Sequence, residues 1–166
     1  MMGDCKDSLE AWKRGAARLD AVGAKLREVG MRLSYHNHDW ELGKFDGDDR
    51  AKLEILMAET TPGNLCAELD LAWVKAGGAE PAELIRKYKG RCPMIHAKDL
   101  VKSKSLLTRG VRFMPLGQGI LDWPGIFAAG KESGVEWYIY EQDNTDEKDI
   151  FQCAKESYDF LKKSLM

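Results

Sequence analysis

The stretch Leu65-Cys66-Ala67-Glu68-Leu69-Asp70 decides the fold, because it is a short apolar run that ends in a carboxylate. The turn residues Thr61-Pro62-Gly63-Asn64 precede it, and a short apolar run after a turn predicts a buried strand. A short helical turn is predicted at residues 71–76, followed by a helix at 81–88 with proline in its first turn. A strand followed by a helix is the repeating unit of parallel α/β folds.

The same unit recurs along the chain. Strands are predicted at residues 31–38, 65–70, 92–98 and 137–141, and helices at 8–29, 50–60, 81–88, 123–133 and 147–165. The last helix carries its apolar residues on one face, namely Ile150, Phe151, Ala154, Tyr158 and Leu161. The glycine-containing stretch 99–121 is predicted to be a loop. One helix followed by four strand–helix units predicts a parallel sheet covered by helices.

Composition and charge are those of an ordinary soluble globular chain, with 44% hydrophobic and 31% charged residues. The 166 residues are expected to form one domain that spans 1–166. The net charge of −2 argues against a nucleic-acid or anionic-membrane binder. No apolar run has the length of a membrane span and no signal peptide is recognisable, so a cytoplasmic protein is expected. Four scattered cysteines are expected to be reduced thiols: Cys5, Cys66, Cys92 and Cys153.

Residues that can carry chemistry gather at the ends of the predicted strands. All three histidines, His36, His38 and His96, lie at or near such an end, and the other two strands end in Asp70 and Glu141. The carboxyl ends of parallel strands form the active-site edge of α/β folds. A single histidine at a strand end is more often structural, but four successive strands that each end in a potential ligand favour a cation site. His36, Asp70, His96 and Glu141 are therefore the predicted metal ligands.

The identity of the cation is restricted by the donor atoms. Two imidazoles and two carboxylates suit Mn²⁺, Zn²⁺, Co²⁺ or Fe²⁺ better than Ca²⁺, which prefers oxygen ligands alone. Mg²⁺ is a less natural occupant of such a set. The expected cofactor is therefore a divalent metal ion, Mn, Zn, Co, Fe or Mg.

Several segments together resemble the xylose isomerase-like sugar phosphate isomerase/epimerase superfamily. They are Tyr35-His36-Asn37-His38-Asp39-Trp40-Glu41, Glu68-Leu69-Asp70-Leu71-Ala72-Trp73, Ile95-His96-Ala97-Lys98-Asp99, Pro115-Leu116-Gly117-Gln118-Gly119 with Asp122-Trp123, and Tyr140-Glu141-Gln142-Asp143. The resemblance covers nearly the whole chain. It implies a (β/α) TIM barrel with a divalent metal at the strand ends, held by ligands that correspond to the four residues named above. The ketose 3-epimerases of the superfamily carry Glu where this chain has His36, and this difference departs from their two-glutamate proton relay.

A further departure concerns size. A TIM barrel has eight strands in about 250 residues, whereas this chain supplies what resemble strands five to eight and begins at the fourth helix. A half barrel exposes two sheet edges and apolar surface that invite pairing with another chain. A homodimer is therefore expected, in which two halves complete a barrel-like core. A fragment of a longer chain would keep the metal ligands without the catalysis.

The resemblance also implies an activity and roles for individual residues. It implies a metal-dependent isomerase, epimerase or dehydratase that acts on a sugar, sugar phosphate or cyclitol by proton transfer beside a metal-polarised carbonyl. Glu141 is expected to be both ligand and base, and His38 the opposite acid or base or a substrate contact. Lys98 is expected to stabilise an enediolate oxygen or to bind a carboxylate or phosphate. Simple pairing of Lys98 with Glu68 or Asp99 is an equal alternative.

Substrate contacts are expected from Glu41, Trp73 and Glu68. Each has another interpretation, because Glu41 could act as the opposite acid or base, Trp73 could simply pack, and Glu68 could hold a ligand histidine, which is the favoured role. The stretch Gly117-Gln118-Gly119 is interpreted as a flexible active-site loop, since it does not open a helix as a phosphate-binding loop does.

Two other function classes remain open at this point. One is a non-catalytic remnant that binds a metal or a partner. The other is a metal-dependent endonuclease for abasic DNA, which shares the barrel of the superfamily. That activity would need more metal ligands and a basic surface, and the three histidines and net charge of −2 count against it.

Overall fold

The protein is described by a computed structural model that covers residues 5, 8–104, 110–145 and 148–165. Its centre is a four-stranded sheet in the order β1-β2-β3-β6, made of β1 (Ser34–His36), β2 (Cys66–Asp70), β3 (Met94–Ala97) and β6 (Trp137–Tyr140). All neighbouring strands are parallel, with His36 opposite Glu68 and Asp70 opposite His96. The predicted parallel α/β class is confirmed, and the sheet is an open, partial barrel.

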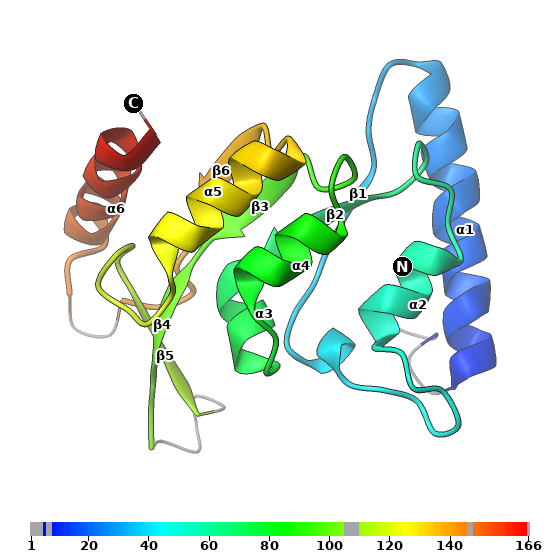
Figure 1. The fold of residues 1–166 in the computed structure, drawn as a ribbon, viewed down its shortest axis with the longest axis horizontal. Helices are drawn as coiled ribbons and strands as arrows, with labels where there is room; N and C mark the ends of the chain where they lie inside the picture. The colour runs from blue at the N-terminus through cyan, green and yellow to red at the C-terminus, as the bar shows by residue number, and fades with distance from the viewer. Residues whose placement is uncertain (1–4, 6–7, 105–109, 146–147, 166) are drawn as a thin grey trace.

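Helices cover one side of this sheet and flank both of its edges (Figure 1). They are α1 (Leu9–Glu28), α2 (Lys52–Ala58), α3 (Leu71–Ala76), α4 (Pro81–Lys87), α5 (Trp123–Ser133) and α6 (Ile150–Leu165), with a 3₁₀ turn η2 at Trp40–Leu42. The Ser8 side chain caps α1 by accepting from the Ala11 N–H at 3.2 Å. Gly134 ends α5 in the left-handed conformation, with φ of 79°. Local capping chemistry therefore sets the start of α1 and the end of α5.

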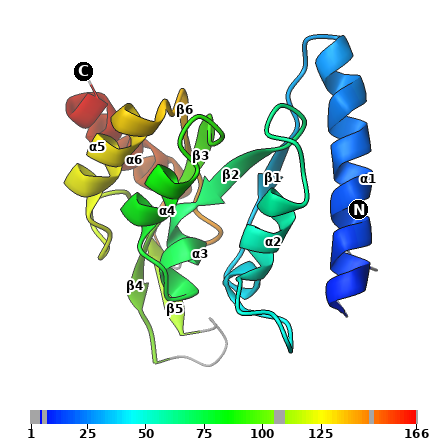
Figure 2. The ribbon, with the colours of Figure 1, turned by 45° about the vertical axis from the view of Figure 1, so that its right-hand side comes forward.

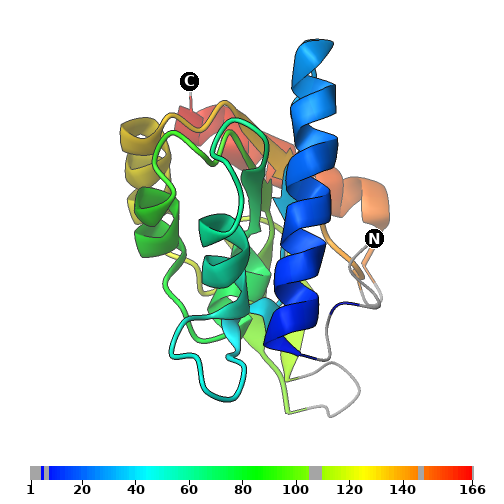
Figure 3. The ribbon, with the colours of Figure 1, turned by 90° about the vertical axis from the view of Figure 1, so that its right-hand side faces the viewer.

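Alternation along the strands separates the core from the polar face. Ala67, Leu69 and Ile95 point to the outer side and are fully buried beneath the helices. Trp12 of α1 is also fully buried, and its ring nitrogen donates to the Lys52 carbonyl at 2.8 Å. Residues of the opposite parity face the inner side, away from these helices. Figures 2 and 3 show the sheet and its helices from two further directions. The polar rim residues therefore lie on the side that the helices leave open.

The prediction of a loop at 99–121 was wrong in part. An antiparallel hairpin forms there from β4 (Asp99–Lys102) and β5 (Val111–Met114). Its apolar residues Leu100, Val111 and Phe113 are buried against Ala72 and Trp73 in a small second cluster. Contacts with α3 therefore form a hairpin that the many glycines and lysines of this stretch concealed. Residues 105–109 of the predicted loop lie outside the described part of the chain.

The closing helix also differs from its prediction. It begins at Ile150, and the predicted start at residue 147 lies outside the described residues. Its buried residues are Cys153 and Ser157, whereas Ile150, Phe151 and Tyr158 of the predicted apolar face are exposed. β6 is an outer strand of the sheet, and no strand of the described residues pairs with its other side.

Two expectations from composition can be compared with the structure. None of the described helices combines the length and the apolar character that crossing a membrane requires. All four cysteines are free thiols, as expected.

Candidate metal centre

The structure brings the four predicted ligands together at the carboxyl rim of the sheet. His36 and Asp70 are the last residues of β1 and β2, His96 lies in β3, and Glu141 directly follows β6. One donor atom from each can be chosen so that all four lie within 4.8 Å of one another. The His36 Nε2 atom is 3.6 Å from Asp70 Oδ2, and the rings of His36 and His96 are 4.2 Å apart. Adjacent parallel strands ending at one rim produce this convergence.

These donors fit a divalent transition-metal ion. Metal–nitrogen and metal–oxygen bonds are about 2.0–2.2 Å long, so donors on opposite sides of an ion lie about 4 Å apart. The observed spread of at most 4.8 Å closes to that size with small side-chain movements. Two imidazole nitrogens and two carboxylate oxygens also match the preference of Mn²⁺, Zn²⁺, Co²⁺ and Fe²⁺.

His96 is held by a carboxylate on each ring nitrogen. Its Nε2 lies 2.6 Å from Glu68 Oε1, and its Nδ1 contacts Glu141 Oε2. Burial alone would lower the pKa of His96, but the hydrogen bonds to Glu68 and Glu141 raise it above its ordinary value. Because Glu141 belongs to the cluster of donors and Glu68 does not, Nδ1 is the nitrogen available to an ion. Glu68 is then the outer carboxylate that orients a ligand histidine.

The protein environment shifts the pKa values of His36 and Asp70 in opposite directions. Burial, helped by the nearby His96, lowers the pKa of His36 to about 4, so its imidazole is neutral and able to bind a metal near pH 7. Burial raises the pKa of Asp70 to about 6, against the opposing effect of the Lys98 ammonium. Asp70 is fully buried, and its Oδ1 atom accepts from the Trp73 N–H at 3.0 Å. Its other oxygen remains directed towards the cluster.

Lys98 is the buried cation of the site, with 1% of its surface exposed. Its ammonium lies 2.7 Å from Asp143 Oδ1, 3.2 Å from Asp70 Oδ2 and 3.5 Å from Glu141 Oε2. Burial would lower the pKa of Lys98, but these carboxylates, Asp70 foremost, raise it, so the side chain stays charged. Lys98 therefore pairs with Asp70, Glu141 and Asp143, and not with Glu68 or Asp99 as the alternative interpretation had it.

Aromatic rings complete the wall around Lys98. The ammonium lies 4.8 Å from the centre of the Phe113 ring and 5.6 Å from that of Trp73. Trp73 also packs edge-on against Phe113 and lies 5.9 Å from the ring of His38. Trp73 therefore both packs and borders the site, because it is 7% exposed and stands between Lys98 and His38.

His38 and Glu41 occupy different positions although both were expected to meet the substrate. His38 is exposed, and its ring lies 5.1 Å from that of His36. Glu41 is 1% exposed, and its two oxygens accept from the Tyr35 hydroxyl at 2.8 Å and the His38 backbone N–H at 2.9 Å. Both oxygens of Glu41 are thus engaged within the protein, and its side chain has almost no surface left for a substrate. Its position therefore supports a role in holding the His38 backbone.

Sequence reasoning did not single out three further residues of this region. Asn37 is fully buried and accepts from the Asp70 N–H at 3.1 Å, which ties β1 to β2 at the rim. Asp143 bonds to Lys98, and Phe113 lies beneath it. Asn37 and Asp143 lie within the motifs quoted in the sequence analysis and could have been recognised there. Phe113 lies in the stretch that was predicted to be a loop, where no pattern pointed to it.

Asp99 adjoins the site but is organised differently. Its buried Oδ2 atom accepts from the N–H groups of Gly117 at 3.0 Å and Gly119 at 3.1 Å and from the Trp123 ring at 2.8 Å. Its Oδ1 accepts from the Leu100 N–H at 2.9 Å. A Cβ atom on Gly119 would lie 2.0 Å from this carboxylate, so glycine is required there. The Gly-Gln-Gly stretch is thus anchored on an internal carboxylate.

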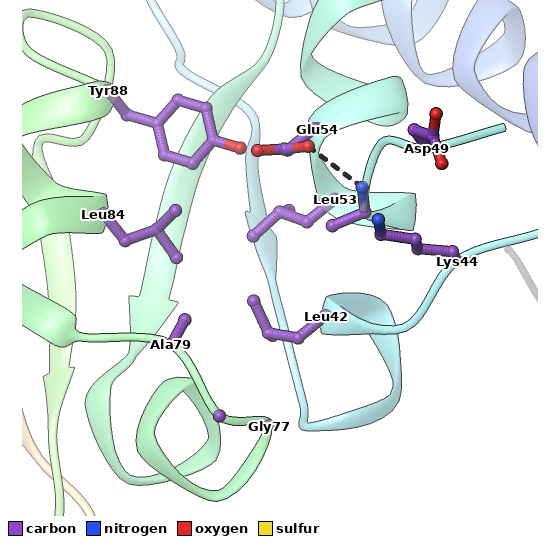
Figure 4. Close-up of a pocket in the computed structure, with 11 residues that line it drawn as sticks. Leu42, Lys44, Asp49, Leu53, Glu54, Gly77, Ala79, Leu84 and Tyr88 are labelled. Carbon is purple, nitrogen blue, oxygen red and sulfur yellow. Dashed lines mark hydrogen bonds between the residues drawn. The ribbon is translucent and has the colours of Figure 1, made fainter.

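A separate hollow of about 340 Å³ lies on the outer flank between α2 and α4 (Figure 4). Leu42, Leu53 and Leu84 line it, and the buried Tyr88 hydroxyl has no hydrogen-bond partner among the described residues. Glu54, which also lines it, is already bonded to the Ala51 N–H and to Lys87. The hollow contains none of the rim residues, so the chemistry is assigned to the rim.

The fold and the site define a class, namely a parallel α/β chain of barrel type with a polar cluster at its carboxyl rim. The profile of the xylose isomerase-like TIM barrel family matches residues 2–164, and the chain belongs to this family. The inosose dehydratase of Lacticaseibacillus casei is 28% identical over 165 residues, which cover 92% of this chain and 54% of that protein.

Solved structures show the same fold. A sugar phosphate isomerase/epimerase from Parabacteroides distasonis superposes with a TM-score of 0.76 at 21% identity, over 93% of this chain and 52% of that one. An L-ribulose 3-epimerase superposes with a TM-score of 0.68 at 19% identity, over 95% and 55% of the two chains. The chain therefore spans about half the length of the relatives that it matches.

Proposed function

We propose that this chain carries the metal centre of a divalent-metal-dependent enzyme that dehydrates, epimerises or isomerises a sugar, sugar phosphate or cyclitol. The observation that carries the proposal is the convergence of four metal-competent donors within 4.8 Å at the ends of four parallel strands. Relatives named inosose dehydratase and L-ribulose 3-epimerase support the substrate class.

The donors that would hold the ion are His36, Asp70, His96 through Nδ1, and Glu141. When bound, a divalent cation supplies a Lewis acid that polarises a carbonyl oxygen of the substrate and acidifies the neighbouring C–H bond. Glu68 would keep the ring of His96 oriented through Nε2, at the 2.6 Å distance now observed. Asn37 would keep the β1 end beside Asp70.

Proton transfer is assigned to Glu141 and His38. Burial would raise the pKa of Glu141, but its bond to His96 and the nearby Lys98 lower it, so the carboxylate is ionised and can accept a proton. His38 is exposed beside His36 and would face the leaving group. The Lys98 ammonium would stabilise negative charge that develops on a substrate oxygen.

Within this class we favour dehydration. Epimerisation needs two groups that exchange a proton on opposite faces of one carbon. The position where 3-epimerases of the superfamily carry Glu is His36 here, whose pKa is lowered to about 4 and whose nitrogen faces Asp70. One base, Glu141, with one acid, His38, is sufficient to remove water. A cytoplasmic location belongs to the same proposal, since free thiols are typical of a reducing compartment.

The inner side of the sheet leaves part of the proposed site uncovered. Glu141 and His36 keep 36% and 26% of their side-chain surfaces exposed on this side. The homodimer expected from the sequence is one way to cover them.

The proposal is tested by metal uptake and turnover. The chain loaded with Mn²⁺ is expected to bind about one ion and to dehydrate inosose, followed by absorbance of the unsaturated product. Glu141→Gln is expected to reduce turnover by about 100-fold or more, whereas Glu83→Gln, an exposed change on α4, leaves it unaltered. Failure to bind the ion would contradict the proposal. Stoichiometric binding without turnover of inosose or a ketose would replace it with the non-catalytic remnant.

A further inference from the structure

The ammonium group of Lys98 lies against both carboxylates of the candidate metal centre. It is 3.2 Å from Oδ2 of Asp70 and 3.5 Å from Oε2 of Glu141. The same Asp70 oxygen lies 3.6 Å from Nε2 of His36. The same Glu141 oxygen contacts Nδ1 of His96. The ammonium therefore meets the oxygen atoms that face the imidazole donors, which are the atoms that would bind an ion.

The fold fixes the position of this ammonium. Lys98 directly follows β3 and is 1% exposed. The rings of Phe113 and Trp73 border its charged end, with their centres 4.8 and 5.6 Å from Nζ. The nearest carboxylate is that of Asp143 at 2.7 Å, which keeps 38% of its side-chain surface exposed. Because rings and carboxylates surround the ammonium, a rotation of the side chain cannot carry its charge into water.

A positive charge at this position is not needed to hold a cation. His36 and His96 bind a metal as neutral imidazoles, while Asp70 and Glu141 contribute two negative charges. Those two charges alone would neutralise a divalent ion. Lys98 adds one positive charge in contact with both carboxylates. Repulsion between like charges is strong at short range where water is excluded, so this ammonium must oppose binding of the ion.

We propose that Lys98 sets the charge of the metal centre: it holds down the affinity for the divalent cation and leaves a bound cation with a net positive charge. The inference rests on the metal centre of the proposed function and deepens it. A cation that its ligands do not fully neutralise is a stronger Lewis acid towards a substrate oxygen. Asp143 acts in the opposite direction, because its carboxylate is nearest to the ammonium and offsets part of its charge.

The test measures the affinity of the full chain for Mn²⁺ by titration calorimetry at pH 8, above the ordinary pKa of carboxyl groups. Lys98→Met keeps a long unbranched side chain between the two rings and removes the charge. Its affinity for Mn²⁺ is expected to rise by about tenfold or more. Asp143→Asn leaves the ammonium without its nearest carboxylate, so its affinity is expected to fall by about tenfold.

Two matched controls change the same residue types at other ion pairs. Lys87→Met removes a lysine that pairs with Glu54 on the outer flank. Asp159→Asn removes a carboxylate that pairs with Lys155 on the exposed side of α6. Both variants are expected to bind Mn²⁺ as the unaltered chain does, because neither pair includes a rim residue.

The direction of the Lys98→Met effect separates the inference from a structural role. A lysine that only positions the two carboxylates would weaken binding when it is removed, and weaker or unchanged affinity would overturn the inference. If circular dichroism shows that Lys98→Met does not fold, the neutral and polar Lys98→Gln is expected to give the same gain. An increase in affinity in Asp143→Asn would also contradict the inference.

The proposed function and this inference fail in different ways. If neither the unaltered chain nor Lys98→Met binds Mn²⁺, the metal centre is absent and both are wrong. If the unaltered chain binds the ion and Lys98→Met binds it no more tightly, only the inference is wrong. Turnover is not used as the readout, because Lys98 is also assigned to a substrate oxygen and its loss would slow the reaction in either case.

Discussion

Asp70 and Asp99 are both fully buried carboxylates near the rim, yet their surroundings differ in kind. Asp99 accepts from backbone N–H groups and the Trp123 ring, so that both of its oxygens are bonded to N–H donors of the protein. Asp70 has one oxygen bonded to the Trp73 N–H, while the other faces Lys98 and His36. A buried carboxylate whose oxygens are all bonded to N–H donors stabilises the fold. One that keeps an oxygen facing ionisable groups is available to bind a metal ion or to exchange a proton.

The largest expected effect is on stability when Asp99 is changed. Asp99→Asn places an amide NH₂ against several N–H donors, and breaking a buried charged network costs about 3–5 kcal/mol. The free energy of unfolding, measured in urea, should fall by that amount. Asp122→Asn, at the exposed cap of α5, is the control and should cost about 1 kcal/mol or less. Equal losses in the two variants would contradict the structural role of Asp99.

Asp70→Asn should act on metal binding instead. Removing an anionic ligand is expected to weaken Mn²⁺ affinity by about 100-fold or more, measured by titration calorimetry. The free energy of unfolding of the metal-free protein should change by less than about 1 kcal/mol, because the burial that raises the pKa of Asp70 already disfavours its charge. A large loss of stability with unchanged affinity would reverse the comparison with Asp99.

Glu68→Gln should give a smaller effect on the same measurement. Glu68 orients His96 from the side away from the other donors, and loss of such an outer carboxylate typically weakens metal binding by about 10-fold to 100-fold. Glu136→Gln, which changes a carboxylate on the exposed Arg32 pair, is the matched control and should leave affinity unchanged. If Glu68→Gln abolished binding completely, Glu68 would be a ligand itself.

The smallest effect is the pH dependence of metal affinity. With the pKa of Asp70 raised to about 6, a proton competes with the ion below that pH, and affinity should fall by about tenfold per pH unit. Metal-free stability is a poorer readout. The raised pKa of Asp70 makes stability fall as pH rises from 3.8 to about 6, whereas the pKa of His36, lowered to about 4, makes stability rise with pH from about 4 to 6.5. Affinity that did not vary between pH 5 and 7 would contradict the placement of Asp70.

Much of the fold followed from the sequence because strand–helix alternation is a local pattern. Apolar runs ending in Asp70 and His96 predicted two neighbouring strands, and parallel strands must finish at one rim. The hairpin β4–β5 was missed because its strands are short and depend on Trp73 for burial. Glu41 was expected to meet substrate, but its contact with the Tyr35 hydroxyl depends on how the chain turns after β1.

The sequence by itself determined which residues reach the rim, since the two-residue period of a strand and the direction of a parallel sheet are set locally. Only the tertiary structure decided what each rim residue faces. The carboxylate partners of Lys98, the two carboxylates on His96 and most of the N–H groups around Asp99 come from segments 18 or more residues away. Such contacts depend on packing and sheet curvature, which no local pattern encodes.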